Sequence, residues 1–219
     1  MTPLELARGP LLKAAVSWFV VGVTWRLASL LLKRKSPDPS APRPGAPSAL
    51  AGAAYTIIRR SWHNREFHEQ AAIPNIVAHT FHIGLLIIVA LGTPHILFWA
   101  DIVGFRWPGL PKGIIDVVSG ITLAALLFAL WRRVHHPVRR HLSDANDYFT
   151  WLVTALPVVT GLLLTSGLGA RYETMLALHI MSFELLLAWV PFGKLMHAFL
   201  WVFSRGTTGA RFAHRGART

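Results

Sequence analysis

The run LLAWVPFGKLMHAF, residues 186–199, places a proline, a lysine and a histidine inside an otherwise apolar segment. Its histidine, His197, follows His179 of the same segment by eighteen residues. Eighteen steps of about 100° return a continuous helix to the same azimuth, and at 1.5 Å per residue they cover about 27 Å. The hydrocarbon core of a bilayer is about 30 Å thick. As one helix, the segment therefore predicts a histidine near each face of a membrane.

The composition also predicts a membrane protein. Of the 219 residues 53% are hydrophobic and only 15% are charged, and the mean hydropathy is +0.44. The charged residues lie between apolar runs, whereas a soluble domain would interleave them. Five runs are long enough to cross a bilayer, namely 11–32, 75–98, 114–131, 149–168 and 177–203. The expected fold class is all-α, an integral membrane bundle of five transmembrane helices.

The first apolar run is interpreted as a retained helix, because it lacks a small-residue cleavage site and is followed by LLKRKS, typical of a stop-transfer flank. A segment with five prolines within 37–47 follows it. The expected organisation is then a first transmembrane helix (1–32), a Pro-rich cytoplasmic linker with an interfacial helix (33–74), a four-helix membrane core (75–203) and a basic cytoplasmic tail (204–219).

The net charge of +12 is distributed unevenly. Fifteen Lys and Arg lie in 33–74, in 132–146 and after 204, against five in the other connecting segments. Because basic loops stay in the cytoplasm, this asymmetry places the N-terminus outside and the C-terminus inside. It predicts a multi-pass protein of the cytoplasmic (inner) membrane, with lipid and a docked cytoplasmic protein as partners and no nucleic acid.

Histidines within the apolar runs are the candidate functional residues. There are five, His79, His82, His95, His179 and His197, and an ionisable group in hydrocarbon usually has a partner. Haem iron is such a partner, because neutral imidazole ligates it. The chain has no cysteine, which excludes a thiolate-bound iron–sulfur cluster, a C-x-x-C-H haem and a disulfide.

Two other classes of membrane protein are alternatives to a haem-binding one. A proton-coupled transporter or metal permease would also carry histidines within its spans, but it would normally show broken helices at matching positions in two halves. Five spans do not divide in this way. A purely structural anchor has no reason to tolerate five intramembrane histidines.

Two motifs and one spacing resemble a known family. FHIGLLIIVALGTPH (81–95), VPFGKLMH (190–197) and the interval from His179 to His197 resemble the gamma subunit of membrane-bound respiratory nitrate reductase. Its relatives include di-haem cytochrome b subunits of sulfur-metabolism, heterodisulfide-reductase-like and hydrogenase complexes. The resemblance implies two haem b groups between the second and fifth spans. It also implies electron transfer between quinone or quinol near the outer face and a cytoplasmic iron–sulfur subunit.

Within such a complex, this chain would be an electron-transfer subunit of a quinone-linked oxidoreductase rather than a stand-alone enzyme. A cytochrome b subunit of a membrane-bound hydrogenase or formate dehydrogenase is the alternative redox interpretation.

The resemblance also implies the haem ligands. His82 and His197 correspond to ligands of the inner haem, and His179 to a ligand of the outer haem. The family's fourth ligand position is Gly92 here, and we expect His95 to take its place. His95 lies about 20 Å of helical rise beyond His82 but some 140° off its face, so Gly92 and Pro94 are expected to interrupt the helix and re-aim the ring.

Five further residues have two open interpretations each. His79 is expected to donate to a propionate or carbonyl, with an outer-haem ligand as the alternative. Lys194 and Arg26 suit haem propionates or simply reach the membrane surface. Lys112 and Asp116 are candidate quinone-binding residues or ordinary interfacial charges. A sixth, Glu184, lies on a proton path or makes a structural hydrogen bond.

Overall fold

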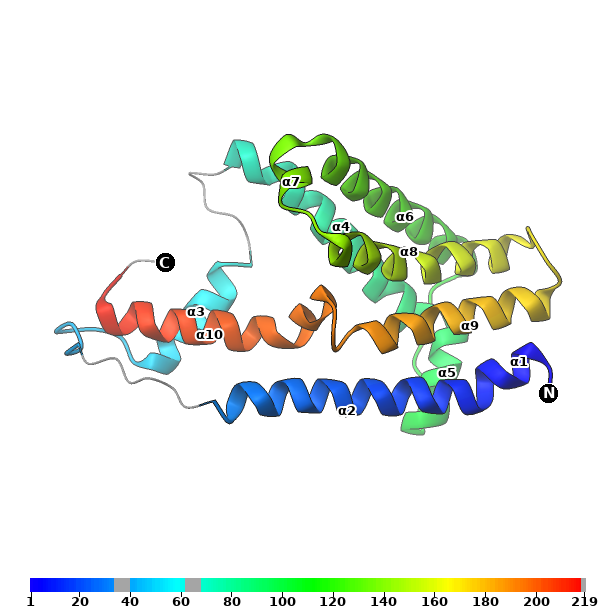
Figure 1. The fold of residues 1–219 in the computed structure, drawn as a ribbon, viewed down its shortest axis with the longest axis horizontal. Helices are drawn as coiled ribbons and strands as arrows, with labels where there is room; N and C mark the ends of the chain where they lie inside the picture. Colours follow the sequence, from blue (N-terminus) through cyan, green and yellow to red (C-terminus); the bar gives the residue numbers. More distant parts are fainter. Residues whose placement is uncertain (34–39, 62–67, 218–219) are drawn as a thin grey trace. The chain divides into compact units, whose positions relative to one another are not determined.

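The computed structural model describes residues 1–33, 40–61 and 68–217. The helices of this part of the chain are α1 (Pro3–Leu6), η1 (Ala7–Leu11), α2 (Leu12–Leu31), α3 (Ala49–Arg59), α4 (His68–Leu91), α5 (Thr93–Val103), α6 (Lys112–His135), α7 (Pro137–His141), α8 (Ala145–Ser166), α9 (Tyr172–Trp189), η3 (Lys194–Met196) and α10 (His197–Arg215). The all-helical fold class is confirmed for these residues (Figure 1).

Four helical segments are long and apolar enough to cross a membrane: Pro3–Leu31, Glu69–Leu91, Lys112–His135 and Ala145–Ser166. The pair formed by α9 and the helix after it would be a fifth if it is a single interrupted span. Large apolar side chains on these segments point outward, among them Trp25, which is 72% exposed, and Leu86, which is 66% exposed. Such surfaces are expected where helices face lipid.

The chain divides into two compact units. The first contains Met1–Phe19 and Ile73–Trp189, and the second contains Val20–Ala72 and Val190–Thr219. The boundaries of these units fall within α2, in the first turns of α4 and at the end of α9. Each unit is described by itself below.

In the first unit, α6 packs against α8 and α8 packs against α9 (Figure 1). The core between α6 and α8 is formed by Leu126, Ala155 and Val158. Trp151 Nε1 donates a hydrogen bond to the Leu126 carbonyl at 2.7 Å, which links the two helices through the core. The glycine of FHIG, Gly84, is buried where a side chain would collide with the Thr122 hydroxyl. This glycine therefore allows α4 to approach α6 closely.

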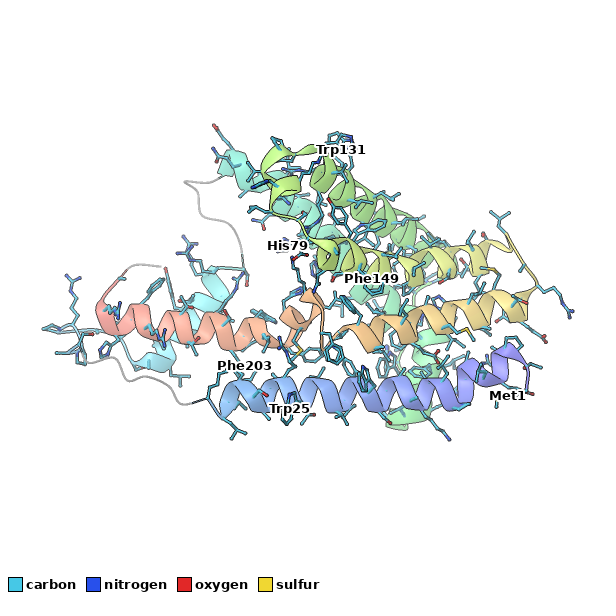
Figure 2. The ribbon with its side chains drawn as sticks, viewed as in Figure 1. Met1, Trp25, His79, Trp131, Phe149 and Phe203 are labelled. Atoms are coloured by element: carbon cyan, nitrogen blue, oxygen red, sulfur yellow. The ribbon has the colours of Figure 1, made fainter. Side chains whose placement is uncertain are left out.

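The α8–α9 contact is fixed by aromatic and polar side chains. Trp189 Nε1 donates to the Thr150 hydroxyl at 3.0 Å. Phe149, labelled in Figure 2, meets the Trp189 ring edge to face with a centroid separation of 4.6 Å. On another side α9 packs against α1 and η1. The helix α9 is therefore enclosed by α8 and by the beginning of the chain.

The connection from α6 to α8 holds a buried carboxylate. Asp147, whose side chain is 7% exposed, pairs with Arg133 at 2.8 Å, and Arg133 also donates to the Ser143 hydroxyl at 3.0 Å. Asp144 and Asp147 form a capping box that begins α8. This corner orders the basic segment around α7.

In the second unit, α3 lies along α10 with almost no side chain between their backbones. A side chain on Gly209 would collide with the Gly52 carbonyl and with Thr56. At the end of α10, His214 Nε2 lies 2.7 Å from the Ser40 carbonyl. The expected tail 204–219 is thus helical to Arg215 and packed against α3, because small residues on both helices allow close contact.

The fifth predicted span, 177–203, is not one continuous helix. α9 ends at Trp189, residues 190–193 form a turn, and the chain re-enters helical structure only at Lys194. Pro191 lacks an N–H and disfavours helical geometry at Val190, and Gly193 is extended with φ −89° and ψ 179°. His179 and His197 are therefore not on one continuous helix, and the helical period does not relate their directions.

The second predicted span, 75–98, also differs. α4 begins at His68 and contains Pro74, and it ends at Leu91. The remaining residues form the separate helix α5. Residues 62–67 of the expected interfacial segment lie outside the described residues.

Candidate functional site

The helix is interrupted between α4 and α5, at the position predicted from Gly92 and Pro94. Gly92 leaves the helical conformation, with φ −74° and ψ 123°, and α5 starts with Thr93 and Pro94 in its first turn. A proline suits the first turn of a helix because the N–H there has no helical partner. The break turns the local sequence into the start of a new helix, on which His95 is the third residue.

The break leaves carbonyl groups of the last turn of α4 to be satisfied by other donors. Pro94 has no N–H to give to the Ala90 carbonyl, and Trp107 Nε1 donates to it instead, at 2.6 Å. The Leu110 N–H donates to the Leu91 carbonyl at 2.9 Å. The loop 104–111 is thereby folded back onto the break.

The same break directs the His95 ring. His95 Nδ1 lies 2.9 Å from the Ile88 carbonyl, seven residues earlier in the chain. A side chain on Gly92 would lie 3.1 Å from His95 Nδ1 and 2.6 Å from the Ile88 carbonyl oxygen. Glycine at position 92 is therefore required for this bond, which spans the break.

His179 is held from the neighbouring helix α8. Its Nδ1 lies 3.1 Å from the Thr160 hydroxyl, which donates its own hydrogen to the Leu156 carbonyl at 2.8 Å. With that hydroxyl hydrogen used, the Thr160 oxygen accepts the Nδ1–H of His179. A side chain on Gly161 would lie 3.2 Å from His179 Cε1. Thr160 and Gly161 thus set the tautomer and the position of this ring.

His95 and His179 lie opposite each other in the first unit. Their ring centroids are 6.1 Å apart and their planes are inclined by 41°. In both rings Nδ1 is bonded as a donor, so Nε2 carries the lone pair. Since an imidazole nitrogen binds a metal at about 2.0 Å, two rings whose centroids are 6.1 Å apart are close enough for both to reach one metal ion.

The other two predicted ligands are not in one unit, and their pairing stays a prediction. In the first unit, His82 is exposed, its Nδ1 is 2.7 Å from the Ala78 carbonyl, and its ring stacks on Phe81. In the second unit, His197 is exposed and its Nδ1 is 2.7 Å from the Lys194 carbonyl. Each ring is held by its own helix through Nδ1.

His79 belongs to the same helix as His82 and has a similar local bond. Its Nδ1 lies 2.8 Å from the Asn75 carbonyl. It precedes His82 by three residues, so it lies nearly one helical turn away, while His95 is the histidine whose ring lies opposite His179.

Of the four other predicted site residues, two lie in the first unit and two in the second. Lys112 and Asp116 form an ion pair with each other in the first turns of α6, with side chains 66% and 32% exposed. Arg26 and Lys194 are exposed in the second unit. Trp107 and Thr160, which position the two rings, were not singled out from the sequence, because their partners are backbone and side-chain atoms of other helices.

The chain is similar in sequence to a known bacterial protein. A protein of Nitratidesulfovibrio vulgaris, strain Hildenborough, is 31% identical to it over 216 residues, which are 95% of this chain and 88% of that protein. The chain belongs to the family of this protein. The relationship with the Nitratidesulfovibrio protein extends over nearly the whole chain and is not confined to one apolar helix. No family model matches the chain, and no solved structure matches it significantly.

Proposed function

We propose that the chain is a di-haem cytochrome b subunit that transfers electrons between quinone and a cytoplasmic iron–sulfur protein. The observation that carries the proposal is the pair His95 and His179, with a centroid separation of 6.1 Å and both Nδ1 atoms hydrogen-bonded. Ligating histidines usually donate their other ring N–H in this way.

The composition of the pair favours haem over a bare metal ion. Among the described residues no group of three or more His, Cys, Asp or Glu could hold a metal. Two imidazoles leave the other coordination positions to be filled, and the four nitrogens of a porphyrin would fill them. When bound, haem supplies a one-electron carrier. The apolar helices around the site would exclude water from it.

The chain's own residues would do the positioning. His95 and His179 would each hold the iron through Nε2. With Nδ1 of His95 bonded to the Ile88 carbonyl and Nδ1 of His179 bonded to the Thr160 hydroxyl, both rings are fixed in position and Nε2 is left for the ligand role. For His82 and His197 as ligands of an inner haem, the proposal rests on the sequence resemblance.

The test is optical. Purified protein should give a reduced-minus-oxidised spectrum of a b-type cytochrome and about two haems per chain, since four histidines make two bis-histidine sites. His95→Ala should remove one haem, while His136→Ala, which changes an exposed histidine between α6 and α7, should keep both. A colourless protein from haem-replete cells would refute the function. Loss of haem in His79→Ala but not in His95→Ala would refute the pairing.

A proton-coupled transporter is the second candidate, because two apolar segments are interrupted, after Leu91 and after Trp189. Interrupted helices form ion and substrate sites in transporters. The optical test separates the two functions, since a transporter would be colourless and would move protons across sealed vesicles without any electron donor.

We also propose an orientation with the N-terminus outside and a basic cytoplasmic face for the partner. The corner between α6 and α8 supports such a face, because the last turn of α6 and the short helix α7 carry Arg132, Arg133, Arg139 and Arg140. Because the chain lacks cysteine, single-cysteine variants report topology directly. An impermeant thiol reagent should label Leu168→Cys from outside intact cells and should not label Leu142→Cys. The opposite result would invert the topology.

A further inference from the structure

Glu184 of α9 is a buried carboxyl group without a partner. It is 4% exposed, and neither carboxyl oxygen has a hydrogen bond from a described residue. Of its two interpretations from sequence, the structural hydrogen bond is therefore absent from the described part of the chain. An isolated carboxylate in apolar surroundings is costly, so such a group either binds a proton or is retained for its charge.

Glu184 lies on the side of α9 that is turned away from α8. His179 and Ser182 bond to Thr160 of α8. Glu184 is five residues beyond His179, about 140° around the helix and about 7.5 Å along it. Ala177 shares this side of α9 and is 2% exposed. Since α9 also packs against α1 and η1, we place Ala177 and Glu184 on the side towards the first helical segment.

The ionisable groups on the neighbouring elements do not neutralise Glu184. Glu5 of α1 bonds the Thr2 N–H, and Asp147 of α8 pairs with Arg133. Arg8 of η1 and Lys13 of α2 are exposed. No ion pair to Glu184 exists among the described residues. His179 of the same helix, with the His95 ring beside it, lies about 140° around α9 from Glu184.

Resting on the proposed haem site, we propose that Glu184 is a proton-binding site whose occupancy follows the charge at the His95–His179 pair. A haem held by this pair would supply a one-electron carrier. For each electron that a quinol or a chemical reductant delivers, the Glu184 carboxylate would take up one solvent proton, from H₃O⁺ with release of H₂O, and form an O–H bond. On oxidation this bond breaks and the proton leaves. Electron and proton then enter and leave together, so the charge within the bundle stays constant.

Electrostatics sets the size of the coupling. A unit charge about 12 Å away, at an effective dielectric constant of about 20, changes the proton affinity of a carboxylate roughly tenfold. The exposed carboxylate Glu173, six residues before His179 on the same helix, is screened by water and should respond much less. The expected response to the charge at the histidine pair therefore depends on the burial of Glu184 and not only on its position on α9.

The test is infrared redox-difference spectroscopy of the full chain in lipid vesicles. Reduction should produce the C=O band of a protonated carboxyl group in the wild-type protein. This band should vanish in Glu184→Gln, an isosteric change that cannot bind the proton, and should persist in the matched control Glu173→Gln. A parallel measurement uses the midpoint potential of the haem that His95 would hold, identified by its absence in His95→Ala. In the wild-type protein this potential should depend on pH, and in Glu184→Gln it should be independent of pH.

The outcomes separate the two proposals. A wild-type protein with full haem content but without the carboxyl band or the pH-dependent potential overturns the role of Glu184 alone. So does a band that persists in Glu184→Gln. A colourless protein overturns both. Should Glu184→Gln fail to accumulate, Glu184→Asp should keep the proton site with a shifted band, and the two wild-type measurements still decide.

Discussion

Replacement of Trp107 by phenylalanine tests how the chain positions His95. The indole N–H donates at 2.6 Å to the Ala90 carbonyl, which the proline at position 94 leaves without its helical donor. Phenylalanine keeps an aromatic ring near Phe105, whose ring centroid lies 5.7 Å from that of Trp107, but it removes the N–H together with part of the indole volume. The substitution therefore measures the lost hydrogen bond together with a small loss of packing.

Leaving a partly buried carbonyl unsatisfied costs about 1–3 kcal/mol. That energy would be lost from the local stability of the loop 104–111, so its opened population should rise roughly 5- to 150-fold. The Leu110 N–H, which bonds the Leu91 carbonyl, is the reporter because it exchanges only when the loop leaves the break. Hydrogen exchange measured by mass spectrometry on peptides covering 104–111 gives this factor directly.

The matched control is Trp25→Phe, since Trp25 is 72% exposed and its loss should leave exchange in 104–111 unchanged. In Trp107→Phe we also expect part of the haem bound by His95 to be lost during purification. Equal exchange of Leu110 in wild type and Trp107→Phe would refute the role of this bond, and the position of His95 would then have another cause.

Three further substitutions test other contacts. Thr160→Val removes the hydroxyl that accepts from His179 and should speed haem loss about 10- to 100-fold, measured by transfer to a haem-scavenging globin; an unchanged rate would argue against the ligand role. Arg133→Met removes the ion-pair partner of the buried Asp147 carboxylate, which keeps the Asp144 N–H as a donor, and should lower the free energy of unfolding by about 1–3 kcal/mol in detergent titrations; an effect below about 0.5 kcal/mol would show that water replaces the pair. Gly209→Val should force α10 from α3 and expose 197–215 to proteases, whereas wild-type cleavage kinetics would contradict the close packing.

The sequence alone determined the apolar helices and one of the two places where they are interrupted. These features depend on a few neighbouring residues: apolar length fixes a span, and a proline without an N–H breaks the ladder of hydrogen bonds wherever it stands. The break at Gly92 and Pro94 was predicted in this way. The interruption around Pro191 was not predicted, since 177–203 was expected to form one helix; Pro191 and Gly193 act together there.

Only the tertiary structure decided which side chains meet. That the His95 ring lies opposite His179, that Trp107 satisfies the Ala90 carbonyl and that α10 packs on α3 all depend on how separate helices cross. The sequence likewise could not show that Glu184 is isolated, because this depends on which side chains of the described neighbouring helices reach its carboxyl group, and none of them bonds to it. Helical periodicity gives the face on which a residue lies, but the helix that covers this face is set by packing over the whole unit.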